Sequence, residues 1–405
     1  MKQIKQLFIF LSLVTLIWGC KDNTNNQKDV GSLTPAQDSI GNWGYINEAG
    51  EVVIPYKWLH ADFFHEGKAL VVGKNELIGF IDEKGELVIP CKWKNAYSFH
   101  FGLAAVQDDN EKWGFIDEKG ELVIPCKWEI AEQFVPKKPG FVSVEELTAQ
   151  DTWAPVVNDK NKMGYIDQTG KEIIPCQWDH IQDFISEDSL TIVCNDGKYG
   201  VIDMAGNLVI PCKWKHILRF NDQIFSNGTL TFYSGPLCPE GLFGVQGDNG
   251  KWGFLDTTGK EVIPCQWNKA YLFREGMALV QDDNDKWGFI DHTGKVVIPC
   301  QWNEAWHFKD DLAQVKDENN KWGFIFKSGT SVIPCKWEEV DDFYEGLALI
   351  KDENGKWGYI DKTGNVVIPC QWDHASDFID GLASVKDEHG TYKYIDKTGK
   401  FVEKE

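Results

Sequence analysis

Apolar and polar residues alternate in short runs along this chain, and turn residues separate the runs. In "GLALIKDENGKWGYIDKTGNVVIPCQWDHASDF", Gly346–Phe378, the pattern predicts β-strands over residues 347–352, 356–361 and 365–372. Asn354 and Gly355 suit the positive φ angles of a tight hairpin turn. Residues 373–381 then predict a short connection to the next run. No 3.6-residue period is visible, so we expect an all-β fold.

The same pattern recurs along the chain. Most Ile-Pro pairs are 35 or 36 residues apart, and two larger gaps of 50 and 53 residues indicate insertions within 131–162 and 215–250. A tenth half-copy, residues 392–405, follows the nine full copies. One three-stranded unit cannot bury both of its faces, so we expect the units to stack into an elongated superhelical array. A closed ring or propeller is the alternative. The prolines that mark the copies are Pro55, Pro90, Pro125, Pro175, Pro211, Pro264, Pro299, Pro334 and Pro369.

Strand parity predicts which side chains share a face. Alternation places Trp357 and Tyr359 on one face of their strand, opposite Gly358 and Ile360. The glycine that follows the tryptophan indicates a bulge or the close approach of a neighbouring backbone. The proline of the last strand cannot donate to a ladder, so it marks an edge or a bulge. In that strand the same alternation predicts a shared apolar face of Val366, Ile368, Cys370 and Trp372.

These residues resemble a known family. The pattern "KWGFID..G..VIP" is similar to the WG repeat, a short bacterial β-repeat found in long arrays, and the resemblance covers residues 41–405. Four copies replace the motif tryptophan, with Ile78, Met163, Tyr199 and Tyr392. The resemblance implies a binding or scaffolding module without enzymatic chemistry and without a cofactor.

The N-terminus has the pattern of a targeting signal. Lys2 and Lys5 precede the apolar run 7–17, which is too short to span a bilayer, and Cys20 follows Gly19. This arrangement resembles a bacterial lipoprotein signal peptide, which implies that residues 1–19 are removed and that Cys20 carries the lipid. Residues 20–40 are polar and predict a flexible tether. The implied location is the cell envelope, with the protein lipid-anchored to a membrane (outer membrane, periplasmic or surface side).

The net charge of the chain excludes one class of partner. The chain has 41 Lys and Arg against 62 Asp and Glu, a formal net charge of −21. Phosphate binding needs a basic face, so we expect no nucleic-acid partner.

The cysteines are candidates for chemistry because eight of eleven follow an Ile-Pro pair. The "CQWDH" at Cys370–His374 contains a thiol, a carboxylate and an imidazole, which together could make a nucleophile site. However, the first copy has Tyr56 in the thiol's place, and the 35-residue spacing fits no compact zinc motif. We therefore expect buried free thiols, with disulfides as the alternative. Cys194 and Cys238 lie off the pattern and are the pair to test for a bridge.

Histidines and acidic turns give weaker signals. His60, His180, His216 and His374 occupy a slot where other copies have Asn, Ile, Lys or Glu, which is typical of a variable exposed position. Acidic turns such as "QDDNEK" lack the spaced ligands of a calcium loop, so they predict solvated hairpin turns and no metal site.

Aromatic residues outside the repeat pattern are the candidate contact residues. Fifteen of 18 tryptophans occupy two repeat-locked positions, where we expect packing between units, whereas Trp153 and Trp306 are expected to be exposed. Insertions in repeat proteins often lie on the binding face. The residues that we expect to contact a partner are Phe141, Trp153, Phe232, Tyr233, Phe243 and Trp306.

Together these patterns predict a non-enzymatic envelope lipoprotein that binds a protein partner or acts as a scaffold. A glycan-binding accessory lipoprotein is the first alternative, and an enzyme is the second.

Overall fold

The computed structural model describes residues 33–137, 147–182, 184, 189–218, 237–386 and 390–403. Two compact units divide the chain, Met1–Ser98 (unit 1) and Phe99–Glu405 (unit 2). Cys20, Phe141, Phe232 and Tyr233 lie outside the described residues, as do the signal peptide and most of the tether.

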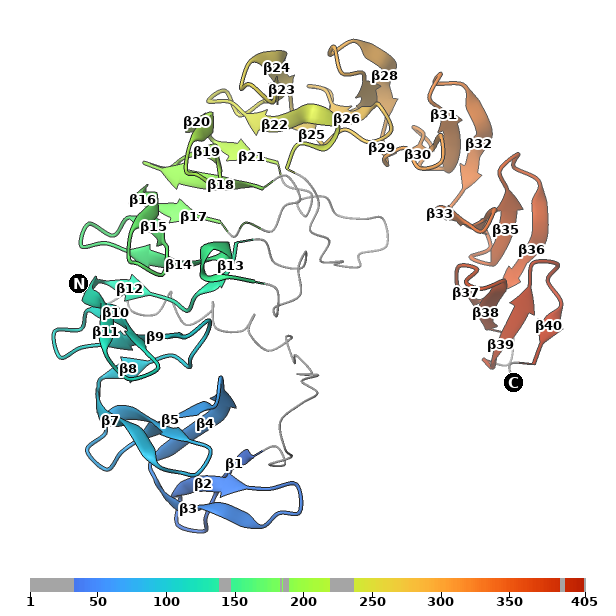
Figure 1. Cartoon of the computed structure of the whole chain (residues 1–405). Helices are drawn as coiled ribbons and strands as arrows, with labels where there is room; N and C mark the ends of the chain where they lie inside the picture. Colours follow the sequence, from blue (N-terminus) through green and yellow to red (C-terminus); the bar gives the residue numbers. More distant parts are fainter. Residues whose placement is uncertain are drawn as a thin grey trace. The chain divides into compact units, whose positions relative to one another are not determined.

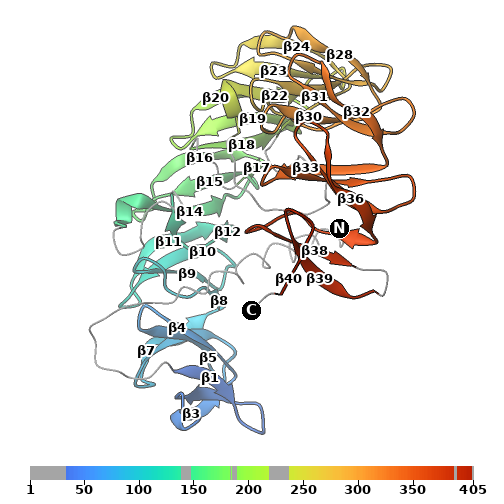
Figure 2. The same cartoon turned by 90° about the vertical axis from the view of Figure 1, so that its right-hand side faces the viewer.

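The repeated element is a small antiparallel meander (Figures 1 and 2). Its strands pair in chain order, so each full sheet runs from a first strand at one edge to a fourth strand at the other edge. The described helical segments are two single 3-10 turns, η2 (Ala149–Asp151) and η4 (Pro239–Gly241). The prediction of an all-β tandem-repeat fold is therefore confirmed.

The first strands are β4 (His60–His65), β8 (Asn95–Ala96), β12 (Ile130–Ala131), β17 (His180–Ile181), β21 (His216–Ile217), β25 (Lys269–Ala270), β29 (Glu304–Ala305), β33 (Glu339–Tyr344) and β37 (His374–Ala375). The second strands are β1 (Thr34–Gln37), β5 (Lys68–Val72), β9 (Leu103–Gln107), β14 (Thr152–Val157), β18 (Leu190–Asn195), β22 (Leu242–Gln246), β26 (Ala278–Gln281), β30 (Leu312–Lys316), β34 (Leu347–Lys351) and β38 (Leu382–Lys386).

The third strands are β2 (Trp43–Ile46), β6 (Ile78–Asp82), β10 (Trp113–Asp117), β15 (Met163–Ile166), β19 (Lys198–Asp203), β23 (Trp252–Asp256), β27 (Trp287–Ile290), β31 (Trp322–Phe326), β35 (Trp357–Asp361) and β39 (Tyr392–Asp396). The fourth strands are β3 (Val52–Trp58), β7 (Leu87–Trp93), β11 (Leu122–Trp128), β16 (Glu172–Trp178), β20 (Leu208–Trp214), β24 (Glu261–Trp267), β28 (Val296–Trp302), β32 (Ser331–Trp337), β36 (Val366–Trp372) and β40 (Phe401–Val402). An extra strand, β13 (Val135–Pro136), pairs with β14.

Two details differ from the sequence prediction. Most sheets have four strands and not three. The tryptophan that ends each fourth strand, here called the outer tryptophan, is followed by a connection that begins with a short strand such as β37. Residues 34–37, expected within the tether, form β1 and pair with β2. A two-residue strand is too short to show a period, which is why the alternation did not reveal β37.

The Trp-Gly motif exists because the fourth strand crosses very close to the third. An ideal Cβ on Gly114 would lie 2.4 Å from the carbonyl oxygen of Ile124, which no side chain can occupy. Trp113 pairs with Trp128 and Phe115 pairs with Ile124, so three residues of β11 stand opposite one residue of β10. The bulge therefore contains the proline, and the expectation of a bulge or close approach at both positions is confirmed.

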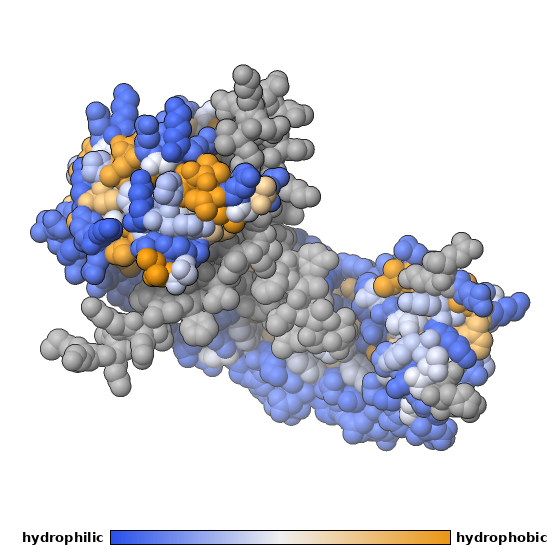
Figure 3. Space-filling model, turned by 90° about the horizontal axis from the view of Figure 1, so that it is seen from below, coloured by the Kyte–Doolittle hydropathy of each residue, from blue (hydrophilic) through white to orange (hydrophobic). Residues whose placement is uncertain are grey.

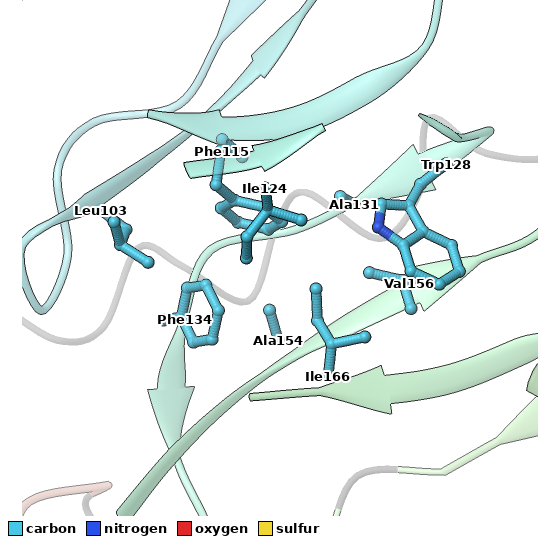
Figure 4. Packing of buried hydrophobic residues seen from close by; sticks show 10 residues of the cluster. Leu103, Phe115, Ile124, Trp128, Ala131, Phe134, Ala154, Val156 and Ile166 are labelled. Carbon is cyan, nitrogen blue, oxygen red and sulfur yellow. The ribbon is translucent and has the colours of Figure 1, made fainter. Parts of the chain in front are cut away.

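The hydrophobic core lies between successive sheets (Figure 4). Phe115 on β10 and Ile124 on β11 project from one sheet. Ala154 on β14 and Ile166 on β15 project toward them from the next sheet, and Phe134 of the connection fills the space between. Each large apolar side chain in such a layer contributes about 1.5–3 kcal/mol relative to exposure. One repeat alone would leave this surface in water, so the repeats fold together.

The bulge corrects the predicted face of the cysteines. Cys370 packs in the layer that contains Ile333, whereas Ile368 and Trp372 of its own strand belong to the next layer. Val366 is 47% exposed. The predicted shared face is therefore confirmed for Ile368 and Trp372 and wrong for Val366 and Cys370, because bulges in the pairing with β35 break the simple alternation.

Polar contacts also join successive repeats. The Glu275 carboxylate accepts the backbone N–H of Asp310 at 2.9 Å and pairs with Lys327 at 3.0 Å. Two repeats further along the chain, Glu345 accepts the N–H of Gly381, and its Oε2 lies 2.9 Å from Nζ of Lys397. These exposed pairs fix the register of the turns and contribute little to stability individually.

On the face seen in Figure 3, hydrophilic residues predominate among the coloured atoms, and apolar residues form separate groups. Several exposed apolar residues lie at the start of fourth strands, among them Val52, Leu87, Leu122 and Val366. The proline in each of these strands removes a hydrogen-bond donor, which protects the edge from pairing with another strand. Among the described residues, no helix is long and apolar enough to cross a membrane.

Candidate functional site

The residues that differ most between copies lie in the connections after the outer tryptophans. Every connection has a phenylalanine six residues after that tryptophan, and Phe273, Phe308 and Phe378 are 1%, 3% and 2% exposed. The flanking positions change from copy to copy. In the last four copies they hold aromatic and charged residues, which we call the connection network: Tyr271, Arg274, His307, Lys309, Asp341, Asp342, Tyr344 and Asp377.

Tyr271, Arg274 and His307 form one end of the network. The rings of Tyr271 and His307 meet edge to face, with centroids 5.3 Å apart. The imidazole is half-buried, and this desolvation, together with the Arg274 charge, lowers the pKa of His307 to about 3. The imidazole is therefore neutral at physiological pH. Burial also lowers the pKa of Arg274, which the Asp342 charge partly offsets.

Lys309 joins the middle of the network. Its Nζ lies 3.2 Å from Oδ2 of Asp342 and 4.2 Å from the centroid of the Tyr344 ring. Gln314 on β30 donates from Nε2 to Oδ1 of Asp342 at 2.7 Å. Both oxygens of Asp342 thus have a donor, and the ammonium group is shared between a carboxylate and an aromatic face.

Asp341 and Asp377 form the acidic end. Burial is the main cause that raises the pKa of both carboxyls, and Asp342 raises both further. For Asp377 the combined effect of burial, Asp341 and Asp342 outweighs Lys309 and raises the pKa to about 7. The Oδ1 of Asp341 accepts only a local hydrogen bond, from the backbone N–H of Asp342 at 2.8 Å.

The backbone that carries Asp377 is firmly held. The hydroxyl of Tyr359 donates to the carbonyl oxygen of Ser376 at 2.8 Å. The N–H of Ser376 donates to Ser384, and the N–H of Ser384 donates to Oγ of Ser376 at 2.9 Å. Asp377 is therefore presented from a fixed position against the preceding connection.

The network presents charged groups and aromatic faces and lacks the groups of a catalytic or metal site. It contains no thiol or serine placed next to a base. Within the ranges that the structure describes, no group of three His, Cys, Asp or Glu residues could hold a metal ion. The network can bind a partner that offers complementary charge and apolar surface.

The predicted contact residues have different places. Trp153 is 2% exposed and packs against Tyr165 and Phe184, and Phe243 is 0% exposed. The expected exposure of Trp153 is therefore wrong, because it fills an inward position of β14 that leucine occupies in other copies. Trp306 is half-buried in the connection that also carries His307 and Lys309.

The cysteines and histidines add no second site. All ten cysteines of the described chain are free and half-buried, Cys194 and Cys238 included. Burial and the Asp352 carboxylate raise the pKa of Cys370 to about 11, which keeps the thiol protonated. His180 and His374 are exposed, as expected for their variable slot, whereas His216 lies between the Tyr199 and Trp252 rings.

Sequence reasoning missed the charged members of the network. Asp342 and Asp377 lie 35 residues apart and meet only because successive connections stack. One feature of the sequence could have revealed these residues. When the nine copies are aligned with one another, the positions beside an invariant phenylalanine vary from copy to copy.

The fold and the site define an all-β tandem-repeat protein, with a constant core and variable connections. The family described as "WG containing repeat" matches nine segments, and the chain belongs to this family. The matched residues are 43–77, 78–112, 113–137, 163–199, 199–225, 252–287, 287–322, 322–357 and 357–392.

No curated protein matches the chain. Among solved structures, the computationally designed Ika8 protein is 11% identical, with a TM-score of 0.30, covering 74% of this chain and 94% of its own. BamB from Moraxella catarrhalis is 13% identical, with a TM-score of 0.28, covering 60% and 79%. Hsv2p from Kluyveromyces lactis is 10% identical, with a TM-score of 0.29, covering 54% and 74%. Likenesses at this level carry no argument about function.

Proposed function

We propose that this chain is a non-enzymatic binding or scaffold module of the cell envelope, anchored by a lipid on Cys20. The observation that carries the proposal is the contrast between a constant core and variable, partly buried charged residues in the connections. A purely structural repeat would not need half-buried charges such as Asp341, because burying them costs free energy. We propose that a protein partner contacts the connection network and Trp306.

A photocrosslinking amino acid at position 306, in cells that express the full-length chain, tests this proposal. We expect a crosslinked protein from position 306 and none from position 355, an exposed hairpin turn that serves as the matched control. The same crosslinked bands from both positions, or from neither, would contradict the proposed surface.

The inserted segment gives a second test. Shortening residues 221–236 should weaken partner capture if the insertion contributes to the surface. The deletion must stop before Leu237, because Leu237 and Phe243 are 8% and 0% exposed and support the core. Unchanged capture would remove the insertion from the binding surface.

The lipid anchor is tested separately. A Cys20→Ser variant should lose the acyl mass on the mature N-terminal peptide and leave the membrane fraction. An unmodified N-terminal peptide in the wild-type chain would contradict the anchor without affecting the binding proposal.

Glycan binding is the alternative that one observation favours, because Trp306 is an aromatic residue outside the repeat pattern that is only half-buried. It predicts a change in tryptophan fluorescence with polysaccharides that Trp306→Ala abolishes. We propose that the chain acts without enzymatic activity, without a cofactor and without a nucleic-acid partner.

A further inference from the structure

We propose that the contact between residues 373–381 and the preceding connection is a pH-responsive junction, in which Asp377 is protonated while the two connections are packed and becomes charged as they separate. The inference does not depend on a partner and goes beyond the proposed binding function.

The first support is the balance of charges at this contact. Three carboxyl groups, those of Asp341, Asp342 and Asp377, come from two successive connections. Lys309 is the cation that acts on Asp377, and its Nζ is already 3.2 Å from Oδ2 of Asp342, whose charge also acts on Arg274. Two cations, both engaged with Asp342, cannot neutralise three half-buried carboxylates, so an uncharged Asp377 fits this place better.

The groups that face this cluster come from four elements. Lys309 comes from the connection after β28, and Gln314 on β30 donates to Asp342. Asp341, Asp342 and Tyr344 lie on β33. Arg274, from the connection before that of Lys309, interacts electrostatically with Asp342 and His307, but it does not act on Asp377.

The second support is the anchored backbone. Ser376 is held by Tyr359 and Ser384, and the N–H of Gly381 donates to the Glu345 carboxylate at 3.1 Å. These bonds on both sides of Asp377 hold its backbone against the preceding copy, through Tyr359 and Glu345, as long as the connection is in place. A charged Asp377 can therefore escape the repulsion of Asp341 and Asp342 fully only if residues 373–381 move away from the preceding connection.

The direction of the pH effect follows from the shift. Burial and the neighbouring carboxylates raise the pKa of Asp377 from 3.8 to about 7. A group whose pKa is raised on packing stabilises the packed state fully below its unfolded pKa, and this stabilisation is lost as pH rises through the folded pKa. The packing of residues 373–386 should thus weaken between about pH 4 and about pH 7.

Two measurements on the full-length chain test the junction. Carbon NMR of the Asp377 carboxyl should show a midpoint near pH 7, and hydrogen exchange should report opening of the backbone over 374–386. After correction for intrinsic rates, we expect exchange in this segment to rise by about tenfold or more between about pH 5 and about pH 8.

The variants separate the cause from general pH effects. Asp377→Asn should abolish the rise, whereas Asp380→Asn, three residues away on an exposed position, should keep it. If Asp377→Asn does not fold, Asp377→Ser replaces it, because Ser98 occupies the same slot in another copy. A carboxyl midpoint near 4, or an equal rise in the Asp377 variants, would overturn the proposal.

Discussion

An ideal Cβ on Gly358 would lie 2.6 Å from the carbonyl oxygen of Ile368, on the neighbouring strand of the same sheet. The obstacle is backbone and cannot rotate away, so β36 approaches β35 this closely only because position 358 has no side chain. The equivalent glycines of other copies meet the same carbonyl at 2.4–2.6 Å. The motif glycine thus has a steric role in the sheet itself.

Gly358→Ala should therefore lower the free energy of unfolding by about 2 kcal/mol or more, because the added methyl group overpacks the strand crossing. Denaturant unfolding followed by tryptophan fluorescence measures the change. Gly355→Asn is the matched control, since nothing lies within 4 Å of an added Cβ and Asn320 adopts a positive φ in the equivalent turn. Equal losses in both variants would argue against the steric explanation.

Trp153→Ala should destabilise the core around β14 and not merely remove a contact surface. The side chain is 2% exposed and lies 4.6 Å from the Tyr165 ring between centroids, so its removal should cost about 3–5 kcal/mol. Trp306→Ala, at a half-buried position, should cost clearly less. Thermal and urea unfolding of the two variants measure both losses of stability. Similar losses would contradict the core position of Trp153.

The aspartate of the second turn should stabilise its sheet through hydrogen bonds. Oδ1 of Asp361 accepts the N–H of Thr363 at 2.9 Å and that of Asn365 at 3.0 Å. Asp361→Ala should cost about 1 kcal/mol for each lost bond. Asp361→Asn should cost less, because Asn47 accepts the corresponding N–H groups in the first copy.

These turn bonds also predict an acid limit. Hydrogen bonds from Thr363 are the main cause that lowers the pKa of Asp361 from 3.8 to about 2. Its stabilisation is therefore present above about pH 4 and is lost as pH falls through about 2. Unfolding curves at acid pH should show this loss in the wild-type chain and a weaker dependence in Asp361→Asn.

The repeat thiols should react slowly in the folded chain. Burial and the Glu172 carboxylate raise the pKa of Cys176 to about 12, and burial with Asp352 raises that of Cys370 to about 11. Iodoacetamide labelling at about pH 8 should be on the order of a hundredfold slower in the native chain than in urea, because the thiolate is scarce. Timed labelling with peptide mass spectrometry measures each site, and fast native labelling of Cys176 would contradict the assignment.

Much of the fold follows from local pattern. The 35-residue period, the turn at Asn354-Gly355 and the alternation of "LALIK" predict short antiparallel strands in tandem, because turn geometry and strand parity depend only on neighbouring residues. The close approach at Gly358 could also be predicted, since a glycine inside a strand needs a steric reason.

The face of Cys370 could not be predicted in the same way. Alternation assumes one residue per step, whereas the bulge places three residues of β36 opposite one residue of β35. Whether such a bulge reverses a face depends on how two strands pair, which the spacing of one strand does not reveal.

The candidate site depends on tertiary structure still more strongly. The sequence by itself determined the repeat, the strand order within it and the positions that vary between copies, because these are properties of each 35-residue unit. Only the stacking of connections brings Lys309, Asp342 and Asp377 together, three residues of three different copies. The burial of Asp377, its repulsion by Asp342 and its attraction to Lys309 exist only in that packed arrangement, and they give this part of the surface its chemistry.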